Sequence, residues 1–288
     1  MSYKISKLSY GTSKPSLILK IDCDLEISDI CYADSVGFIL SLPKHHCIGK
    51  VSNGKVEIPW IGQMNQSGAK DGYLVKLDYP SSVYYLKSHN LCFVIESGGS
   101  KIRKIQLWNR HAIALLGKNS HDKTKSFFAN IKNVGNLKTD CGIDSRGNIY
   151  WVVDGLNRCF KYDVGLGDVV NYVGDGRSGF TVSNSLRNCR LSGPRGVFVD
   201  NKSIYISDTK NRCIRKVEND VTSIAVGDPL KNTILPSKIR GCRNVLYFIN
   251  GQEIRYAANN NTGILYGSEG IISIDVDDDK NIYILEKV

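Results

Sequence analysis

The stretch PRGVFVD at 194–200 is followed by IYISD at 204–208, CIRKV at 213–217 and TSIAVG at 222–227. Each run is short, rich in Val, Ile and Tyr, and bounded by turn-forming residues. Short apolar runs of this composition are typical of β-strands. The stretch therefore predicts four antiparallel strands connected as a meander.

The same four-strand pattern recurs along the chain. Complete copies cover 27–62, 80–117 and 142–174, and a degraded copy covers 245–267. The equivalent second-strand positions are Phe38, Cys92, Tyr150, Tyr205, Leu246 and Tyr283. They are spaced by 54, 58, 55, 41 and 37 residues, so the early repeats carry long connecting loops.

The last copy is incomplete, with two strands at 271–276 and 281–286. The segment 4–8 resembles a third strand and the segment 16–21 supplies a fourth. Strands from both parts of the chain then share one sheet, which closes a ring and removes the unpaired sheet edges of an open array. We predict an all-β fold: a six-bladed β-propeller of four-stranded antiparallel blades, the last closed by the N-terminal strands. At 48 residues per unit, one domain over 1–288 accounts for the length.

The stretches at 194–217 and 142–158 resemble NHL repeats, named for an Asn-His-Leu signature. The resemblance covers nearly the whole chain and is strongest in the copy at 194–227. It departs from the pattern where His45-His46 and Gly99-Ser100 replace the equivalents of Asn211-Arg212. The resemblance implies that Asp208 pairs with Arg212, and Asp154 with Arg158, to tie together the turn between strands 2 and 3.

The composition of the 288-residue chain, with 42% hydrophobic and 23% charged residues, is that of an ordinary globular protein. No uncharged apolar run approaches the length of a membrane span, and lysines are spread through the first twenty residues. We expect neither membrane insertion nor secretion. The nine cysteines form no Cys-x-x-Cys pair and mostly lie in apolar stretches, which favours reduced thiols and a cytoplasmic, reducing compartment.

A net charge of +10 favours an acidic partner, such as a nucleic acid, an anionic surface or an acidic protein. Two connecting loops, 117–138 and 175–195, concentrate the positive charge and are expected on one face. The candidate partner- or RNA-binding residues are Lys118, Lys123, Lys125, Phe127, Phe128, Lys132, Arg177, Arg187, Arg190 and Arg195.

The NHL resemblance implies single-stranded RNA as one partner, because some NHL propellers bind it on such a face. RNA recognition also uses exposed aromatic rings, for which Phe127, Phe128 and Phe180 are candidates. The same rings also suit a role in capping the core beneath the loop. No feature of the sequence is specific for DNA.

The sequence offers little for catalysis. The histidines fall in separate turns, so His89 and His111 are not expected to join His45, His46 and His121. Enzymes resembling this fold, such as peptidyl-hydroxyglycine lyases and lactonases, place metal ligands around the channel, and no such set is recognisable here. The Asp277-Asp278-Asp279 run lacks the spacing of a calcium loop and reads as a polar turn. We expect no catalytic residue, metal or cofactor.

Three functional hypotheses follow from the sequence. The favoured hypothesis is a non-enzymatic scaffold that binds protein partners, or a subunit of a larger assembly, cellular or viral. The alternative is single-stranded RNA binding through the basic loops, which would weaken steeply with salt. A lyase- or lactonase-like enzyme centred on the channel is a third possibility.

Overall fold

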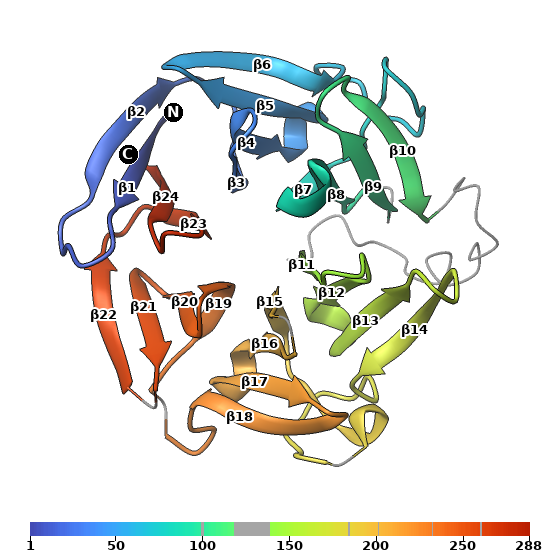
Figure 1. Ribbon diagram of the computed structural model, residues 1–288, viewed down its shortest axis with the longest axis vertical. Coiled ribbons are helices and arrows are strands. Elements are labelled where there is room, and N and C mark those ends of the chain that lie inside the picture. The colour runs from blue at the N-terminus through green and yellow to red at the C-terminus, as the bar shows by residue number, and fades with distance from the viewer. Residues whose placement is uncertain (99–100, 118–138, 184, 201, 232, 260) are drawn as a thin grey trace. The chain divides into compact units, whose positions relative to one another are not determined.

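The computed structural model describes residues 1–98, 101–117, 139–183, 185–200, 202–231, 233–259 and 261–288. It contains six four-stranded antiparallel sheets, each formed from strands that follow one another along the chain, except the sheet that holds both chain ends (Figure 1). The predicted six-bladed β-propeller is confirmed. Among the described residues, no helix has the length and apolar character required to cross a membrane.

The chain packs as two compact units of three blades each. The single domain over 1–288 stays a prediction, because the division into two compact units does not test it. The first unit contains strands β1–β10, β23 and β24, and the second contains β11–β22.

In the first unit, two blades follow the chain and the third combines its two ends. The bounds are β3 Asp29–Ala33, β4 Gly37–Leu42, β5 Cys47–Ser52 and β6 Lys55–Gly62; β7 Pro80–Leu86, β8 Leu91–Glu96, β9 Lys101–Gln106 and β10 His111–Leu116; and β23 Ile271–Val276, β24 Ile282–Lys287, β1 Ser2–Leu8 and β2 Ser16–Asp22.

In the second unit, three blades follow in order. The bounds are β11 Thr139–Ile143, β12 Ile149–Val153, β13 Arg158–Asp163 and β14 Asp168–Val173; β15 Pro194–Val199, β16 Ile204–Asp208, β17 Cys213–Glu218 and β18 Val221–Gly227; and β19 Pro236–Cys242, β20 Val245–Asn250, β21 Glu253–Ala258 and β22 Asn261–Gly267.

The predicted joining of the chain ends is confirmed. Strand β1 pairs antiparallel with β24, with Ile5 opposite Leu285, and with β2 on its other side. Figure 1 shows the two ends of the chain in this blade, whose strand order is β2-β1-β24-β23. Tyr3, Ile5 and Leu285 are buried in one apolar cluster with side chains of β3–β5.

The six second-strand positions aligned from the sequence all lie in second strands, namely β4, β8, β12, β16, β20 and β24. Within the described residues, the loops contain five single-turn 3₁₀ helices: η1 Pro43–His45, η2 Lys87–His89, η3 Asp154–Leu156, η4 Leu186–Asn188 and η5 Thr209–Asn211. Three of them lie between the second and third strands of a blade, and each ends on a left-handed residue: His46, Asn157 or Arg212. His46 is therefore equivalent to Arg212, as the alignment of the repeats predicts. In the blade of β11–β14 the left-handed residue is Asn157, one residue before the Arg158 that the alignment sets opposite Arg212.

The segment between β6 and β7 protects the outer edge of its blade. Gly72 and Ala112 exchange backbone hydrogen bonds, and the Ala114 N–H donates to Asp71. An otherwise unpaired edge of β10 is thereby covered, which is one way in which proteins prevent edge-to-edge association.

Candidate functional site

A buried carboxylate joins the inner strands of the first unit. Asp29 of β3 accepts hydrogen bonds from Ser82 Oγ at 2.8 Å and from Val83 N at 3.0 Å, both on β7. It also accepts a bond from Ser273 Oγ of β23 at 2.5 Å. The three inner strands thus meet near their N-terminal ends, and Asp29 has a structural role.

A second buried carboxylate has the same role in the second unit. Asp140 of β11 accepts hydrogen bonds from Lys238 Nζ at 2.9 Å and Arg240 Nη1 at 3.1 Å, both on β19. It also accepts a bond from Val197 N of β15 at 3.2 Å. Neither aspartate is among the residues predicted from the sequence. The available signal was a charged residue at the start of an otherwise apolar first strand.

Carboxylates at the ends of second strands form another repeated structure. Asp208 accepts from Ser192 N at 2.7 Å, Asn211 Nδ2 at 2.7 Å and Arg215 Nε at 3.0 Å. Burial raises the pKa of Asp208 above its ordinary value, against the opposing effect of these donors. One carboxylate therefore holds the incoming loop, the turn and the third strand together.

Glu96 repeats this arrangement in the first unit. It accepts the Asp78 N–H at 2.8 Å and pairs with Arg103 Nε, and both ion-pair side chains are fully buried. Burial raises the pKa of Glu96 to about 7, although Arg103 acts in the opposite direction. Arg103 also pairs with Asp71, so it connects the loop before β7 to the blade.

Both ion pairs implied by the family resemblance are wrong. Asp208 pairs with Arg215, not with Arg212, whose left-handed backbone closes the turn through its N–H to Thr209 O. Arg215 lies two residues beyond Cys213, the cross-strand partner of Asp208, and so reaches its carboxylate.

The shifted turn changes the second pair. Asp154 accepts from Arg195 Nε at 3.1 Å, and Lys210 Nζ lies 3.8 Å from its other oxygen. Arg158 instead donates to the carbonyl oxygen of Asp175 at 2.8 Å. The turn is one residue earlier than the alignment assumed, which moves Arg158 into strand β13.

The loop between β14 and β15, residues 174–193, is described except at position 184 and belongs to the predicted basic face. Asp175 accepts from Arg177 N at 2.8 Å, Arg177 Nε at 2.9 Å and Arg190 Nε at 3.1 Å. The backbone N–H of Arg177 and the two guanidinium groups hold the pKa of Asp175 below its ordinary value. Arg177 and Arg190 therefore share one carboxylate within the loop.

A small hairpin forms the outer part of this loop. Thr181 and Arg190 pair as an antiparallel bridge, and Ser183 exchanges hydrogen bonds with Thr222 of β18. The ring of Phe180 lies 4.0 Å from the guanidinium carbon of buried Arg215, which is cation–π geometry. Phe180 thus covers the blade, as the capping interpretation expects, although 39% of it remains exposed.

The predicted binding residues have different outcomes. Lys118, Lys123, Lys125, Phe127, Phe128 and Lys132 lie outside the described residues. Arg177, Arg190 and Arg195 are brought together near one loop, but each pairs with an aspartate. Arg187 is exposed and, within the described residues, has no ion pair.

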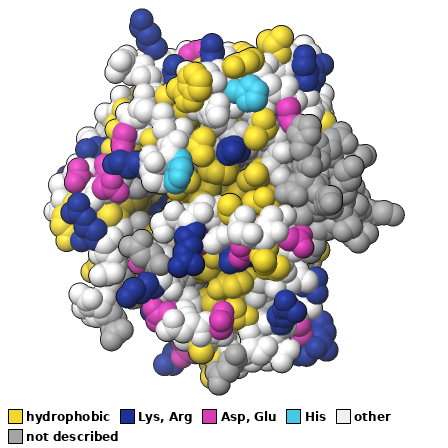
Figure 2. Space-filling view, turned by 45° about the vertical axis from the view of Figure 1, so that its right-hand side comes forward, with side chains coloured by type: hydrophobic (Ala, Val, Ile, Leu, Met, Phe, Trp, Pro, Cys, Tyr) yellow, Lys and Arg dark blue, Asp and Glu magenta, His cyan; other side chains and the backbone are white. Residues whose placement is uncertain are grey.

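Among the described side chains on the face shown in Figure 2, Lys and Arg lie interspersed with Asp, Glu and hydrophobic side chains.

The described histidines occupy separate positions. His45 Nδ1 lies 2.9 Å from Asn65 Oδ1, and His46 Nδ1 accepts the Tyr79 N–H at 3.2 Å. His89 lies in the β7–β8 turn and His111 begins β10, as predicted, while His121 is outside the described residues.

Burial raises the pKa of the Cys47 thiol to about 11. Within the described ranges, no group of three or more His, Cys, Asp or Glu side chains is placed to hold a metal ion.

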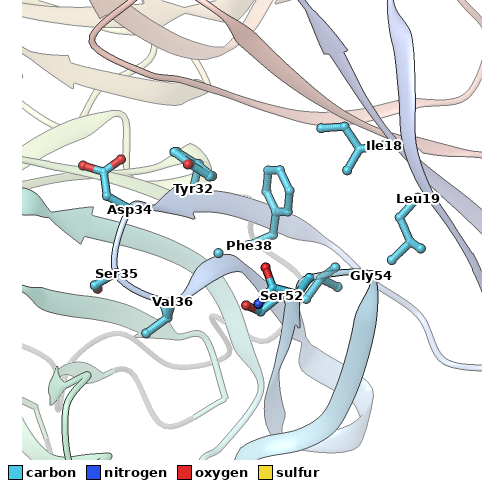
Figure 3. Close-up of a pocket in the computed structure, with 12 residues that line it drawn as sticks. Ile18, Leu19, Tyr32, Asp34, Ser35, Val36, Phe38, Ser52 and Gly54 are labelled. Atoms are coloured by element: carbon cyan, nitrogen blue, oxygen red, sulfur yellow. The ribbon is translucent and has the colours of Figure 1, made fainter.

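A pocket of about 390 Å³ opens in the first unit (Figure 3). Its inner wall carries Phe38, whose ring points into the space between Tyr32 and Ile18. Tyr32 stacks on Tyr283 with ring centroids 4.5 Å apart. Asp34 lies at the edge and pairs with Lys87 at 2.8 Å.

Comparisons with known proteins find similarity in structure alone. No family model matches the chain, and no curated protein resembles it significantly in sequence. Virginiamycin B lyase from Staphylococcus aureus aligns over 99% of this chain and 100% of its own, with a TM-score of 0.56 and 14% identity. A streptogramin B lyase aligns over 99% and 98%, with a TM-score of 0.56 and 11% identity. A protein described as a putative TolB from Agrobacterium tumefaciens aligns over 99% and 98%, with a TM-score of 0.63 and 12% identity. At these identities the similarity supports the propeller fold alone.

Proposed function

We propose that this chain is a non-enzymatic, NHL-like propeller that binds a protein partner through the 174–193 loop, as a scaffold or a subunit of a larger assembly. The observation that carries the proposal is the pairing of Asp175 with Arg177 and Arg190. It fixes the loop, because the two guanidinium groups share one carboxylate. The loop therefore offers a mixed surface instead of a simple anion-binding one.

The exposed side chains of the loop support the same proposal. Val182 is exposed, Phe180 is partly exposed and Arg187 extends from the same small hairpin. Aromatic and arginine side chains are enriched at protein interfaces, and an interface centre is apolar with a polar rim. A partner with an apolar contact and an acidic group opposite Arg187 fits this surface.

The experiment is affinity capture from native lysate with ribonuclease, comparing the wild type with a Val182→Ser/Arg187→Glu variant. A matched control is Arg146→Glu, an exposed arginine in the β11–β12 turn of the same unit. We expect discrete proteins that the loop variant loses and the control retains. Identical protein sets in all three samples would contradict the proposal.

Single-stranded RNA binding is the alternative that the same experiment tests. RNA that is enriched without ribonuclease, released by higher salt and lost in the Arg187→Glu variant would favour it. The pairing of Arg177, Arg190 and Arg195 with aspartates supports the protein-binding proposal over this one.

A lyase-like activity is a second candidate, favoured by the similarity to two lyases over nearly the whole chain. One such lyase has been crystallised as an inactive variant with quinupristin. Incubating the chain with quinupristin and following its consumption by chromatography tests this activity. Turnover would replace the non-enzymatic proposal.

A further inference from the structure

We propose that the buried guanidinium group of Arg215 binds a carboxylate of the protein partner, which enters when the ring of Phe180 turns aside. The inference rests on the protein-binding function proposed above, because the Arg215 site lies beneath the 174–193 loop. It goes further by naming the chemistry of one contact, an Asp or Glu side chain of the partner.

Arg215 carries a donor group that has no acceptor. Its Nε donates to Asp208 at 3.0 Å, and its Nη2 donates to the carbonyl oxygen of Arg190 at 3.3 Å. The side chain is 0% exposed, and its Nη1 has no hydrogen-bond partner among the described residues. A buried donor without an acceptor is unfavourable, so this atom of Arg215 requires an explanation.

Arg103, the equivalent arginine of the first unit, shows what such an Nη1 group binds. Its Nε pairs with Glu96, as Arg215 Nε pairs with Asp208. Its Nη1 pairs with the carboxylate of Asp71, from the loop that leads into the blade. Within the described residues, two carboxylates therefore hold Arg103, whereas one holds Arg215.

The loops that lead into these two blades pass the outer strand at the same place. Gly72 exchanges backbone hydrogen bonds with Ala112 of β10, and Ser183 is hydrogen bonded to Thr222 of β18. In the registers of their blades, Ala112 and Thr222 each lie opposite the residue two positions beyond the buried arginine. The two loops are therefore comparable residue by residue at this point.

The loop of the second unit brings an aromatic ring to this place instead of a carboxylate. The residue before the one paired to the outer strand is Asp71 in the first loop and Val182 in the second. The ring of Phe180 lies 4.0 Å from the guanidinium carbon of Arg215. A ring face attracts the positive charge, but it supplies no carboxylate oxygen to Nη1. A carboxylate from outside the chain would complete the arrangement that Asp71 completes around Arg103.

The ring of Phe180 can turn aside while the backbone of the loop stays in place. Its neighbour Gly179 accepts a hydrogen bond from Asn211 Nδ2 at 2.7 Å, and its other neighbour Thr181 is bridged to Arg190. Phe180 is 39% exposed, so rotation about its Cα–Cβ bond carries the ring into solvent. The guanidinium group then meets the incoming carboxylate in a charge-assisted hydrogen bond.

Titration of the full-length wild-type chain with N-acetylaspartate amide tests the site directly. The readout is the NMR spectrum of the arginine side chains, in which Arg215→Lys identifies the Arg215 signals. We expect these signals to shift and reach saturation, whereas the neutral N-acetylasparagine amide should leave them unchanged. Arg103 is the internal control, because Asp71 already occupies its Nη1.

Variants of Phe180 separate the covering ring from the binding group. Phe180→Ala uncovers Arg215 and should bind the same probe roughly threefold to thirtyfold more tightly, the range that a cation–π contact sets. Phe180→Glu supplies its own carboxylate, so it should no longer bind the probe. It should also unfold at a higher temperature than the matched Phe180→Gln, which has the same shape and no charge.

An unchanged Arg215 signal in both the wild type and Phe180→Ala would overturn the proposal. Equal shifts with the aspartate and asparagine amides would also contradict it. So would equal unfolding temperatures of Phe180→Glu and Phe180→Gln.

Capture from native lysate separates this proposal from the protein-binding function. Phe180→Glu should lose the partner that Phe180→Gln retains, because its carboxylate occupies Arg215. If Val182→Ser/Arg187→Glu loses the partner and Phe180→Glu retains it, the carboxylate contact is wrong and the protein-binding function stands. Binding of the probe with identical captured proteins in every sample would instead overturn the partner as the source of the carboxylate, together with the protein-binding function.

Discussion

Arg215 donates its Nε–H to Asp208 across 3.0 Å, and both side chains are fully buried. Arg103 and Glu96 repeat this ion pair in another blade, again seven residues apart. The same carboxylates accept backbone N–H groups of Ser192 and Asp78, which precede the first strands of their blades. A blade is therefore fixed to the loop that leads into it by one buried charge.

Removing one partner of the pair should be strongly destabilising. Arg215→Met leaves the Asp208 charge buried without its cation, and we expect a loss of about 3–5 kcal/mol in the free energy of unfolding. The double variant Asp208→Leu/Arg215→Met should lose less than Arg215→Met alone. Urea denaturation measures both.

Arg212→Met is the matched control for this prediction. Arg212 closes the same turn through its backbone, so its side chain should contribute about 0.5 kcal/mol or less. If Arg212→Met were as damaging as Arg215→Met, the assignment of the ion pair would be wrong.

Glu96 should make stability depend on pH. Its folded-state pKa of about 7 lies above the ordinary 4.5, so the folded state binds the proton more tightly than the unfolded state. The resulting stabilisation is complete below about pH 4.5 and is lost as the pH rises through 7. The advantage of wild type over Glu96→Gln in denaturation should therefore be larger at pH 5 than at pH 8. An advantage that grows with pH would show that Arg103, and not burial, dominates.

Gly196 should not tolerate a side chain. A Cβ at this position would lie 2.1 Å from the carbonyl oxygen of Ser237 on β19, the inner strand of the next blade. Gly196→Ala should cost about 1–3 kcal/mol, measured by the shift in thermal unfolding. Gly165→Ala, where the nearest atom is a side-chain oxygen of Asp163 at 3.3 Å, should change stability little. Equal effects would contradict the close approach of the two strands.

The turn at 277–281 should be independent of calcium. Asp277 accepts bonds from Asn281 N at 2.9 Å, Asn281 Nδ2 at 2.8 Å and Tyr283 Oη at 3.0 Å. Asp144, Asn148 and Tyr150 form the same arrangement in another blade. Adding calcium or a chelator should leave the melting temperature unchanged, whereas Asp277→Ala should lower it. A calcium-dependent rise in melting temperature would restore the metal-binding interpretation.

The sequence predicts the blades well because strand periodicity and turn residues are local. It identifies the second strands, the pairing of β1 with β24 and the turns that hold the histidines. The polar-turn interpretation at Asp277 is also confirmed. Each depends on residues a few positions apart, or on comparison between repeats.

Contacts between side chains of different blades could not be predicted in the same way. Asp140 meets Arg240, a hundred residues away, and no local pattern specifies that partner. Asp154 pairs with Arg195 because its turn begins one residue earlier than the alignment with Asp208 indicates. A shift of one residue reverses which side of a strand a residue faces, so repeat similarity does not transfer ion pairs reliably.

The most direct test of the account is site-specific photo-crosslinking from position 182 in native lysate, after ribonuclease treatment, compared with crosslinking from position 146. We expect a discrete crosslinked protein from position 182 that is absent from position 146 and lost when Arg187→Glu is added. Crosslinks to RNA alone in untreated lysate, or the same proteins from both positions, would contradict it.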